Sequence, residues 1–493
     1  VKIYESDIVV TPQEWTDKVN VTITTAESLC KIQYKVGEDG EWVDYEDGGF
    51  EVDKNITIYA RLVYKNPGYA DQIMPETSKK ITNIDDIPPE VSLSQTRLAD
   101  VVNVGDYVAY DATSGGEYTY TTDNTLTGAS EISTYNSSDS MKWKVLSVDK
   151  GSGIVELMAE TPTTNEVTFY GKTGYKNAET VLNGIGAVYG HGNGAISGRS
   201  ITVEDINKLE EYTPPEDSTS YTYTSGTFIN SDETEIVATT DSPVTVEYTA
   251  NTEDRSTNRW YKYTTKNFTE EDFWLSSRML YVCSDHVTYM LRFVKQGNVA
   301  NDVEGDLFGS REIQTKQSKA VLPVVTLQTN IQTTGKDESG AWTIQGKRTV
   351  KGTAKDDQTG VVAYQYSKDG TLTSTSEGWT TVEKTAELEA PEYEIGDYGT
   401  YYFYAKDEVG NMSKAEIKAG KLVASTKAGE SITYHTSVQD AINNAGTSMA
   451  TVTLLESVKE GITIAEGQDI TFNMNGNILT NENAKIITNN GTL

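Results

Sequence analysis

Apolar and polar residues alternate with a period of two in many short stretches of this chain. The clearest are VNVTITT (19–25) and NITIYARLVY (55–64). This period is typical of β-strands that bury one face, and turns rich in Gly, Pro and Asn separate the stretches. The chain is therefore predicted to be mainly β, with several short strands in each domain.

One order of elements occurs twice. A Tyr-rich strand, a Gly turn, a tryptophan and a long aromatic strand follow one another at 30–64, with Trp42, and again at 361–411, with Trp379. A repeated order of this kind indicates two copies of one structural module. Its short, regularly spaced strands predict a β-sandwich in each copy.

The segment between the two copies has a different pattern. Strand-like runs recur within 273–331, whereas apolar residues three and four positions apart predict helices at 177–190 and 200–212. Two polar stretches, 112–140 and 213–258, are predicted to be long surface loops, the second with extended segments. Together these patterns indicate an α+β domain.

The pattern changes again near the end of the sequence. A short amphipathic helix is predicted at 437–446, with apolar Val438, Ala441 and Ile442 on one side. Short alternating strands with Gly or Asn turns follow it, as in the first rungs of a parallel β-helix. The predicted domains are β-sandwiches at 1–85 and 340–424, a proline-containing linker at 86–90, an α+β domain at 91–333 and the start of a β-helix at 425–493.

Three parts of the sequence resemble known families. The strand ending Ala-Lys-Asp at 405–407, followed by Gly410-Asn411, resembles the immunoglobulin-like modules of bacterial surface proteins. The middle segment resembles a domain of unknown function in cell-surface proteins of gut Firmicutes. The resemblance lies in the order of six motifs: WKVLS, NAETVLN, SITVEDI, WLSSR, LRFVKQGNV and VLPVVTL. It implies a C-type-lectin-like fold. The segment 425–493 resembles the N-terminal cap and first rungs of a right-handed, pectate-lyase-like β-helix.

Charge and composition narrow the classes of function. The 493 residues carry a net charge of −32, which repels nucleic acid and anionic membranes. No apolar run approaches the length of a membrane span, and no signal peptide is recognisable at the start. The chain starts and stops in mid-pattern, so we expect it to be a piece of a longer protein. Its two cysteines lie in different predicted domains, which excludes a disulfide framework.

Two kinds of site that the sequence could suggest, a zinc or cysteine-based catalytic site and a calcium-dependent sugar site, are not expected. Cys283, Asp285 and His286 have Cys-x-x-His spacing, but a zinc site needs three or four ligands, so a loop or strand end is the simpler interpretation. The Glu-Pro-Asn, Gln-Pro-Asp and Trp-Asn-Asp triplets of calcium-dependent lectins do not occur. We therefore expect neither catalysis at Cys283 nor sugar recognition through calcium.

A ligand surface is the first of two candidate sites. Trp260, Tyr261 and Tyr263 could stack on sugar rings if their faces are exposed, although such aromatic clusters often belong to a core. The family that the middle domain resembles usually has an arginine where Leu322 precedes Pro323. The remaining candidates are the nearby arginines: Arg278, Arg292 and Arg311.

A structural calcium site is the second candidate. Asp356, Asp357, Asp407 and Asn411 lie in acidic turns at predicted strand ends of the second sandwich. Calcium binds six to eight oxygen atoms from converging carboxylates and carbonyls, which two such turns at one pole can supply. Solvated turn residues are the more common explanation of the same pattern. No other cofactor is expected.

The expected function is structural or adhesive and not enzymatic. Spacer modules would present a recognition domain to a host or bacterial glycan or to a protein ligand, outside the cell or on its wall. Two alternatives remain open: an accessory part of a polysaccharide-degrading enzyme with a β-helix, and a purely structural stalk. The sequence does not identify the ligand or the oligomeric state.

Overall fold

A computed structural model gives the structure of the chain. It describes all residues except 1, 70–71, 113–115, 125–128, 137–140, 214–217, 231, 250–262, 266, 269–271, 283, 301–305, 312–314, 430, 448, 476 and 483–484. The fold is mainly β, as the alternating pattern predicts, and divides into two compact units. Unit 1 comprises Val1–Gln95, Thr349–Glu394 and Gly399–Ala419, and unit 2 comprises Thr96–Arg348, Ile395–Tyr398 and Gly420–Leu493.

The first part of unit 1 consists of two antiparallel sheets. Their facing sides alternate with exposed positions, and Val21 of one sheet and Ile58 and Leu62 of the other are fully buried. The predicted strands at 19–25 and 55–64 are confirmed as β2 and β6. In strand order, the sheets are β1 (Ile8–Thr11), β2 (Val19–Ile23) and β5 (Phe50–Val52), and β4 (Val43–Asp44), β3 (Cys30–Val36), β6 (Thr57–Tyr64) and β7 (Thr77–Lys80). This part also contains two short 3-10 helices, η1 (Glu5–Asp7) and η2 (Pro67–Tyr69).

The second part of unit 1 repeats this arrangement. Trp379 lies 4.6 Å from the amine of Lys406, and Trp42 of the first copy lies 4.0 Å from the guanidinium of Arg61, so both copies place a cation over the repeated tryptophan. One sheet contains β30 (Glu387–Glu389), β27 (Thr349–Lys355), β31 (Tyr393–Glu394) and β8 (Glu90–Ser94), and the other contains β29 (Thr380–Thr385), β28 (Val361–Ser367), β32 (Gly399–Asp407) and β33 (Met412–Ala419).

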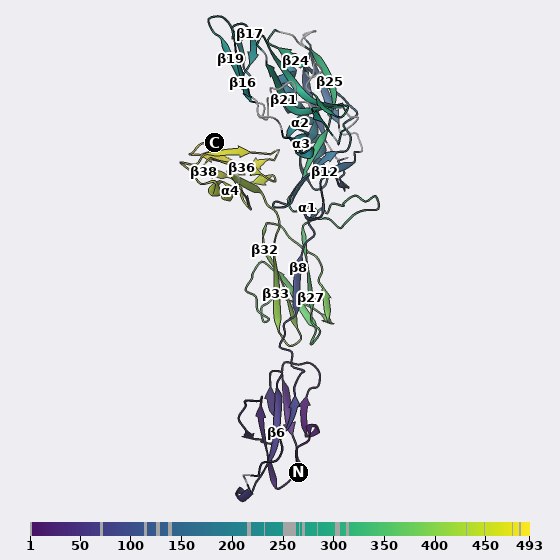
Figure 1. Cartoon of the computed structure of the whole chain (residues 1–493), viewed down its shortest axis with the longest axis vertical. Helices are drawn as coiled ribbons and strands as arrows, with labels where there is room; N and C mark the ends of the chain where they lie inside the picture. Colours follow the sequence, from purple (N-terminus) through teal and green to yellow (C-terminus); the bar gives the residue numbers. More distant parts are fainter. Residues whose placement is uncertain are drawn as a thin grey trace. The chain divides into compact units, whose positions relative to one another are not determined.

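Strand β8 changes the predicted domain boundary. It pairs with β27 in antiparallel register from Glu90–Lys355 to Ser94–Lys351, and Figure 1 shows the two strands side by side. Leu93 packs against the same core as Phe403. Residues 90–94 therefore belong to the second sandwich and not to the linker or the α+β domain, since a five-residue edge strand is too short for its pairing to be recognised from periodicity alone.

Two large sheets form the centre of unit 2. Trp143 and Trp274 are almost completely buried within their common core. The first sheet has the order β15 (Ala195–Ser200), β26 (Pro323–Leu327), β13 (Ile154–Ala159), β12 (Trp143–Asp149) and β9 (Tyr107–Val108). The second has the order β14 (Val167–Tyr170), β25 (Lys316–Val321), β21 (Asp272–Val282), β22 (Val287–Lys295), β23 (Asn298–Ala300) and β20 (Tyr263–Thr264), with β24 (Asp306–Gly309) on β22.

The helices of unit 2 lie against these sheets. The helices predicted at 177–190 and 200–212 are α2 (Gly171–Val188), which continues into η3 (Tyr189–His191), and α3 (Val203–Leu209). Thr202 caps α3 by accepting a hydrogen bond from the Asp205 N–H. The short α1 (Leu98–Val101) was not predicted, because four residues are too few to show a helical period.

The segments predicted as loops contain three hairpins. They are β10 (Glu117–Asn124) with β11 (Ala129–Asn136), β16 (Ser218–Tyr223) with β19 (Val244–Thr249), and β17 (Gly226–Ile229) with β18 (Glu235–Ala238). The prediction of an irregular loop at 112–140 is therefore wrong. Thr and Tyr favour strands without giving an apolar alternation, and the hydroxyls of Thr119 and Thr134 contact each other across the first hairpin.

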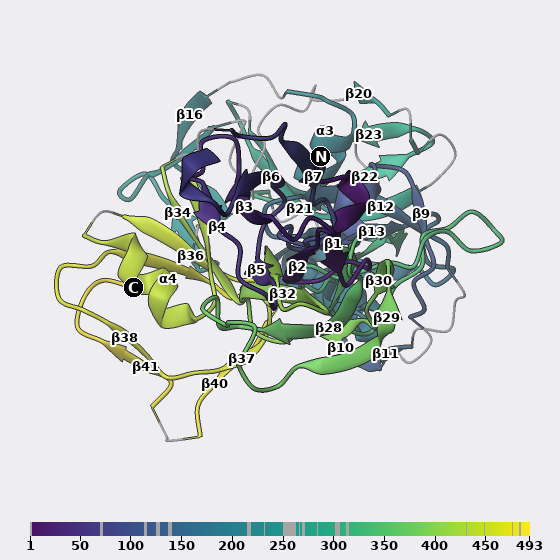
Figure 2. The same ribbon diagram turned by 90° about the horizontal axis from the view of Figure 1, so that it is seen from below.

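The last part of unit 2 combines a hairpin, a helix and stacked parallel strands. Helix α4 (Val438–Ala445), predicted at 437–446, packs on β34 (Ala424–Ala428) and β36 (Ala450–Leu454), as Figure 2 shows, and β35 (Ser431–His435) pairs with β34. Three successive pairs are parallel: β36 with β39 (Ile470–Asn473), β37 (Val458–Lys459) with β40 (Leu479–Thr480), and β38 (Ile462–Ile464) with β41 (Ile487–Asn489). The chain thus makes two stacked turns.

Candidate functional site

Three buried carboxylates meet in unit 1. Asp85 follows the first sandwich, Asp356 follows the end of β27, and Asp407 ends β32. One carboxylate oxygen of each lies within 4.8 Å of the others. The three residues are only 3%, 7% and 1% exposed. Asp85 lies 271 positions before Asp356 and 322 positions before Asp407 in the sequence.

Local backbone contacts hold each aspartate in place. The N–H of Asp85 donates to Thr16 at 2.8 Å, and that of Asp356 donates to Ala386 at 2.9 Å. The N–H of Asp407 donates to the carbonyl of Asn411 at 3.1 Å. The turn between Asp407 and Asn411 passes through Gly410 with φ +97, a conformation that side chains rarely adopt.

Neutral groups supply the hydrogen bonds to the cluster. Asp85 Oδ2 accepts from both the N–H and the hydroxyl of Thr359, and Asp407 Oδ1 accepts from the N–H groups of Gly410 and Asn411. Asp356 Oδ1 accepts from the Gln358 N–H at 2.7 Å. The other oxygen of Asp356, Oδ2, is buried and has no hydrogen-bond partner.

The electrostatics of the cluster are unfavourable without a cation. Two like charges 4 Å apart repel by about 4 kcal/mol at an effective dielectric constant of about 20. Burial raises the pKa of the Asp407 carboxyl above its ordinary value, and the charge of Asp85 raises it further, against hydrogen bonds from Asn411 and Gly410. Among the described residues, no lysine or arginine forms an ion pair with the three aspartates.

The acids next in sequence to Asp356 and Asp407 contact lysines outside the cluster. Asp357 is exposed and lies 3.7 Å from the amine of Lys355, and Glu408 pairs with Lys384 at 2.5 Å. Of the four residues predicted for calcium, the structure brings together Asp356 and Asp407, places Asp357 outside the cluster, and uses the Asn411 amide as a donor to Asp407 Oδ2 and to the Asp85 carbonyl.

Asp85 was not among the predicted metal ligands. It lies in DDIPP, whose two prolines indicate a stiff linker between modules. A signal was nevertheless present: two successive acids, Asp85 and Asp86, stand where the first module ends. The pairing of β8 with β27 and the contacts of Asp85 with Thr359 and Asn411 bring that junction to the turns of the second sandwich.

The residues predicted for a ligand surface separate in the structure. Trp260 and Tyr261 lie outside the described residues, and of Tyr263 only the backbone in β20 is described. Arg292, in β22, is 1% exposed, which corrects the prediction that it contacts a ligand at the surface. Alternate positions of a strand face opposite sides, and in β22 both sides are buried, so exposure could not be inferred from the pattern.

The two other arginines are ion-paired. Arg278, with a side chain 10% exposed, contacts Glu233 and lies 3.9 Å from Glu179, with its guanidinium 5.4 Å from the ring of Tyr175. The side chain of Arg311 is 57% exposed and contacts Asp285 at 2.5 Å.

Arg311 belongs to an exposed polar group with Asp285 and His286. His286 Nδ1 lies 2.9 Å from the second carboxylate oxygen of Asp285, and the neighbouring Val287 N–H donates to the Ser310 hydroxyl at 3.0 Å. The Ser310 N–H also donates to the Val287 carbonyl at 2.8 Å, and this backbone contact holds the segments of His286 and Arg311 side by side. Cys283 lies outside the described residues, so its predicted position in a loop or strand end is not tested.

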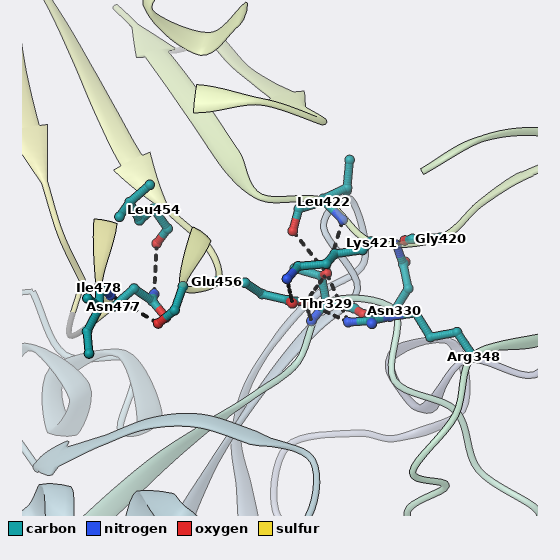
Figure 3. Close-up of polar contacts among 11 residues, drawn as sticks. Thr329, Asn330, Arg348, Gly420, Lys421, Leu422, Leu454, Glu456, Asn477 and Ile478 are labelled. Atoms are coloured by element: carbon teal, nitrogen blue, oxygen red, sulfur yellow. Dashed lines mark hydrogen bonds and ion pairs between the residues drawn. The ribbon is translucent and has the colours of Figure 1, made fainter. Parts of the chain in front are cut away.

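A buried ionic network lies elsewhere in unit 2 (Figure 3). Glu456, only 4% exposed, accepts hydrogen bonds from the Thr329 N–H at 3.1 Å and its hydroxyl at 2.7 Å. Its carboxylate also pairs with Arg348 at 2.6 Å and Lys421 at 2.9 Å. Every charge in this network has a partner. The network therefore stabilises the packing of the β26 sheet against the stacked turns and leaves no charged group available for a ligand.

Comparison with known proteins gives no family for this chain. No family model matches it, and no curated protein matches it. A solved structure of Salmonella alpha-2-macroglobulin reacted with methylamine is 10% identical, with 86% of this chain and 24% of that chain covered and a TM-score of 0.11. Native E. coli alpha-2-macroglobulin is 11% identical, with 84% and 28% covered and a TM-score of 0.11. This chain spans about a quarter of their length, and no conclusion about function follows from such scores.

One further observation concerns membranes. Among the residues that the structure describes, no helix combines the length and the apolar character that spanning a bilayer requires.

Proposed function

We propose that this chain is a non-catalytic part of a bacterial cell-surface protein, in which immunoglobulin-like sandwiches carry a C-type-lectin-like domain that recognises a glycan or a protein outside the cell. The insertion of Thr96–Arg348 between two paired strands is the observation that carries this proposal. The chain leaves β8 after Ser94 and returns at Thr349 in β27, and five residue pairs join these strands. An insert attached at both ends is the arrangement expected of a domain that a spacer presents.

The ligand surface would include the exposed group of Asp285, His286 and Arg311. Their side chains are 59%, 31% and 57% exposed and are grouped by the backbone contact between their loops. A guanidinium, a carboxylate and an imidazole can together donate to and accept from sugar hydroxyls or a peptide. Arginine is also enriched among the residues that contribute most to protein recognition.

An array of host glycans, bacterial glycans and mucins probed with the full chain tests the proposal. We expect binding that Arg311→Ala weakens by at least about tenfold. Lys459→Ala is the matched control, since Lys459 also forms an exposed ion pair, with Glu482 at 3.3 Å, and should leave binding unchanged. The absence of any bound glycan or mucin would reject glycan recognition and favour a protein ligand or a structural stalk.

A second candidate is supported by the three parallel strand pairs of 450–489. Two stacked turns with a helix before them fit the start of a right-handed parallel β-helix, the fold of pectate-lyase-like proteins. The chain would then be an accessory part of a polysaccharide-degrading enzyme. Affinity electrophoresis of the full chain through gels that contain polygalacturonate distinguishes the two. Retardation that Arg311→Ala leaves unchanged supports the accessory role, and array binding that Arg311→Ala weakens, without retardation, supports recognition.

A further inference from the structure

We infer that Asp85, Asp356 and Asp407 form a calcium site that fixes the segment after the first sandwich to the strand ends of the second. This inference does not depend on which ligand the middle domain recognises. It follows from the geometry of the carboxylates, from an unsatisfied buried oxygen and from the way in which the neighbouring lysines are used.

The unsatisfied oxygen is the strongest indication of a missing ligand. Asp356 is 7% exposed, and its Oδ2 is enclosed in protein without a hydrogen-bond donor. Buried polar atoms are nearly always partnered, and an orphaned carboxylate oxygen next to two further carboxylates is what remains when a cation is left out. Gln358, two residues later in the same turn, also has a buried carbonyl oxygen, Oε1, without a partner.

The lysines near the cluster do not neutralise it. Lys355 and Lys384 contact the outward acids Asp357 and Glu408, which stand next in sequence to Asp356 and Asp407. In each pair of neighbouring acids, the exposed acid forms the ion pair with lysine, and the buried acid belongs to the cluster. Three carboxylates therefore share one enclosed space without an ion pair among the described residues, an arrangement that a divalent cation stabilises.

The chemistry of the donors selects calcium among common metals. The cluster offers only carboxylate oxygens, with no histidine or cysteine, so it lacks the nitrogen and sulfur ligands that zinc and copper prefer. Three carboxylates can supply up to six oxygens by binding through one or both atoms, which suits the flexible shell of calcium. Magnesium demands a tighter octahedral shell and usually keeps several waters, for which an enclosed site is poorly suited.

The site would strengthen the attachment of the segment around Asp85 to the strand ends of the second sandwich. Asp85 already accepts two hydrogen bonds from Thr359, and its carbonyl accepts one from Asn411 at 3.0 Å. A cation bound to Asp85, Asp356 and Asp407 adds a shared ligand to the same three segments. Calcium binding should therefore stabilise unit 1 and protect the bonds around Asp85 from proteases.

Calorimetric titration of the full chain with calcium, after removal of metal with a chelator, is the decisive experiment. We expect one site with a stoichiometry of one per chain and an increase in melting temperature on adding calcium, but little response to magnesium at the same concentration. Asp356→Asn should weaken calcium binding by at least about tenfold, because even the loss of a group that only supports a metal ligand costs about 10–100-fold in affinity. Asp357→Asn removes the same charge one position away and should bind like the unaltered protein.

The metal-free proteins give a second readout that does not depend on binding. Without calcium, Asp356→Asn should melt at a higher temperature than the unaltered chain, because it removes one of three repelling charges, and this gain should be absent in Asp357→Asn. Only weak binding at many sites, unchanged in Asp356→Asn, would identify the acidic surface as the source and overturn the inference. No calcium-dependent heat or melting shift in the unaltered chain would also overturn it.

Discussion

Thr359 donates two hydrogen bonds to one oxygen of Asp85, from its N–H at 3.0 Å and from its hydroxyl at 2.5 Å, although the two residues are 274 positions apart. Thr359 is fully buried. The contact joins the end of the first sandwich to a turn of the second and orients the carboxylate within the acidic cluster.

Replacing this threonine tests the contact. Thr359→Val keeps the branched shape but removes the hydroxyl, and we expect unit 1 to lose about 1–3 kcal/mol of unfolding free energy, the cost of a hydrogen bond to a charged group. Chemical denaturation of the full chain in the presence of a chelator measures it. Thr371→Val removes a hydroxyl that bonds the exposed Asp369 and should change stability by less than about 0.5 kcal/mol. Equal losses in both variants would contradict the assigned role.

Glu456 should be essential to the stability of unit 2. Glu456→Ala removes the carboxylate that pairs with the largely buried charges of Arg348 and Lys421 and accepts from the Thr329 N–H. We therefore expect the free energy of unfolding to fall by about 3–5 kcal/mol. Differential scanning calorimetry should show a lower melting temperature for unit 2. Glu482→Ala, which breaks an exposed pair with Lys459, is the control and should have almost no effect. An unaffected transition in Glu456→Ala would show that the network contributes little.

The raised pKa of Asp407 makes stability depend on pH in the calcium-free protein. Because the folded pKa exceeds the ordinary value of 3.8, the folded state binds the proton more tightly than the unfolded state. This contribution favours folding below pH 3.8 and is lost as pH rises through the folded pKa. The difference in stability between the unaltered chain and Asp407→Asn should therefore change over that window and become constant above it. A difference that stays constant throughout would show that Asp407 does not titrate abnormally.

Gly186 allows helix α2 to approach β15. A Cβ at Gly186 would lie 2.0 Å from the carbonyl carbon of Arg199, which belongs to the backbone and cannot rotate away. Gly186→Ala should consequently destabilise unit 2 by about 1–3 kcal/mol, although alanine favours helices. Thermal unfolding measures the loss, and Thr180→Ala at an exposed position of the same helix should be neutral or slightly stabilising. A stabilised Gly186→Ala would disprove the close packing.

The strands and helices with strong periodicity could be predicted from the sequence. Ile58, Ala60 and Leu62 lie at alternate positions of β6 and are buried as expected, and the apolar residues of α2 and α4 lie on buried faces. The hairpins rich in Thr and Tyr were missed because their stability comes from cross-strand pairs such as Thr119 with Thr134, which have no periodic signature.

Part of the acidic cluster could also be predicted, since Asp356 and Asp407 each stand at the end of a strand. The rest required the tertiary structure. Nothing local distinguishes Asp356 from Asp357, and only the packing of the turns decides which carboxylate is enclosed and which meets Lys355. In the same way, Arg292 is as polar as Arg311 in the sequence, but one lies in a strand buried on both sides and the other in an exposed turn.

The pairing of β8 with β27 also sets an order of events during synthesis. Ser94 bonds Lys351, 257 positions later, so β8 leaves the ribosome long before its partner exists. At about 5–20 residues per second, the delay is roughly 10–50 seconds. During that interval the first sandwich can fold, while the edge of β8 remains unpaired and open to pairing with other chains. The second sandwich can be completed only after the inserted segment and β27 have been made, so the speed of synthesis sets how long the edge of β8 stays unpaired.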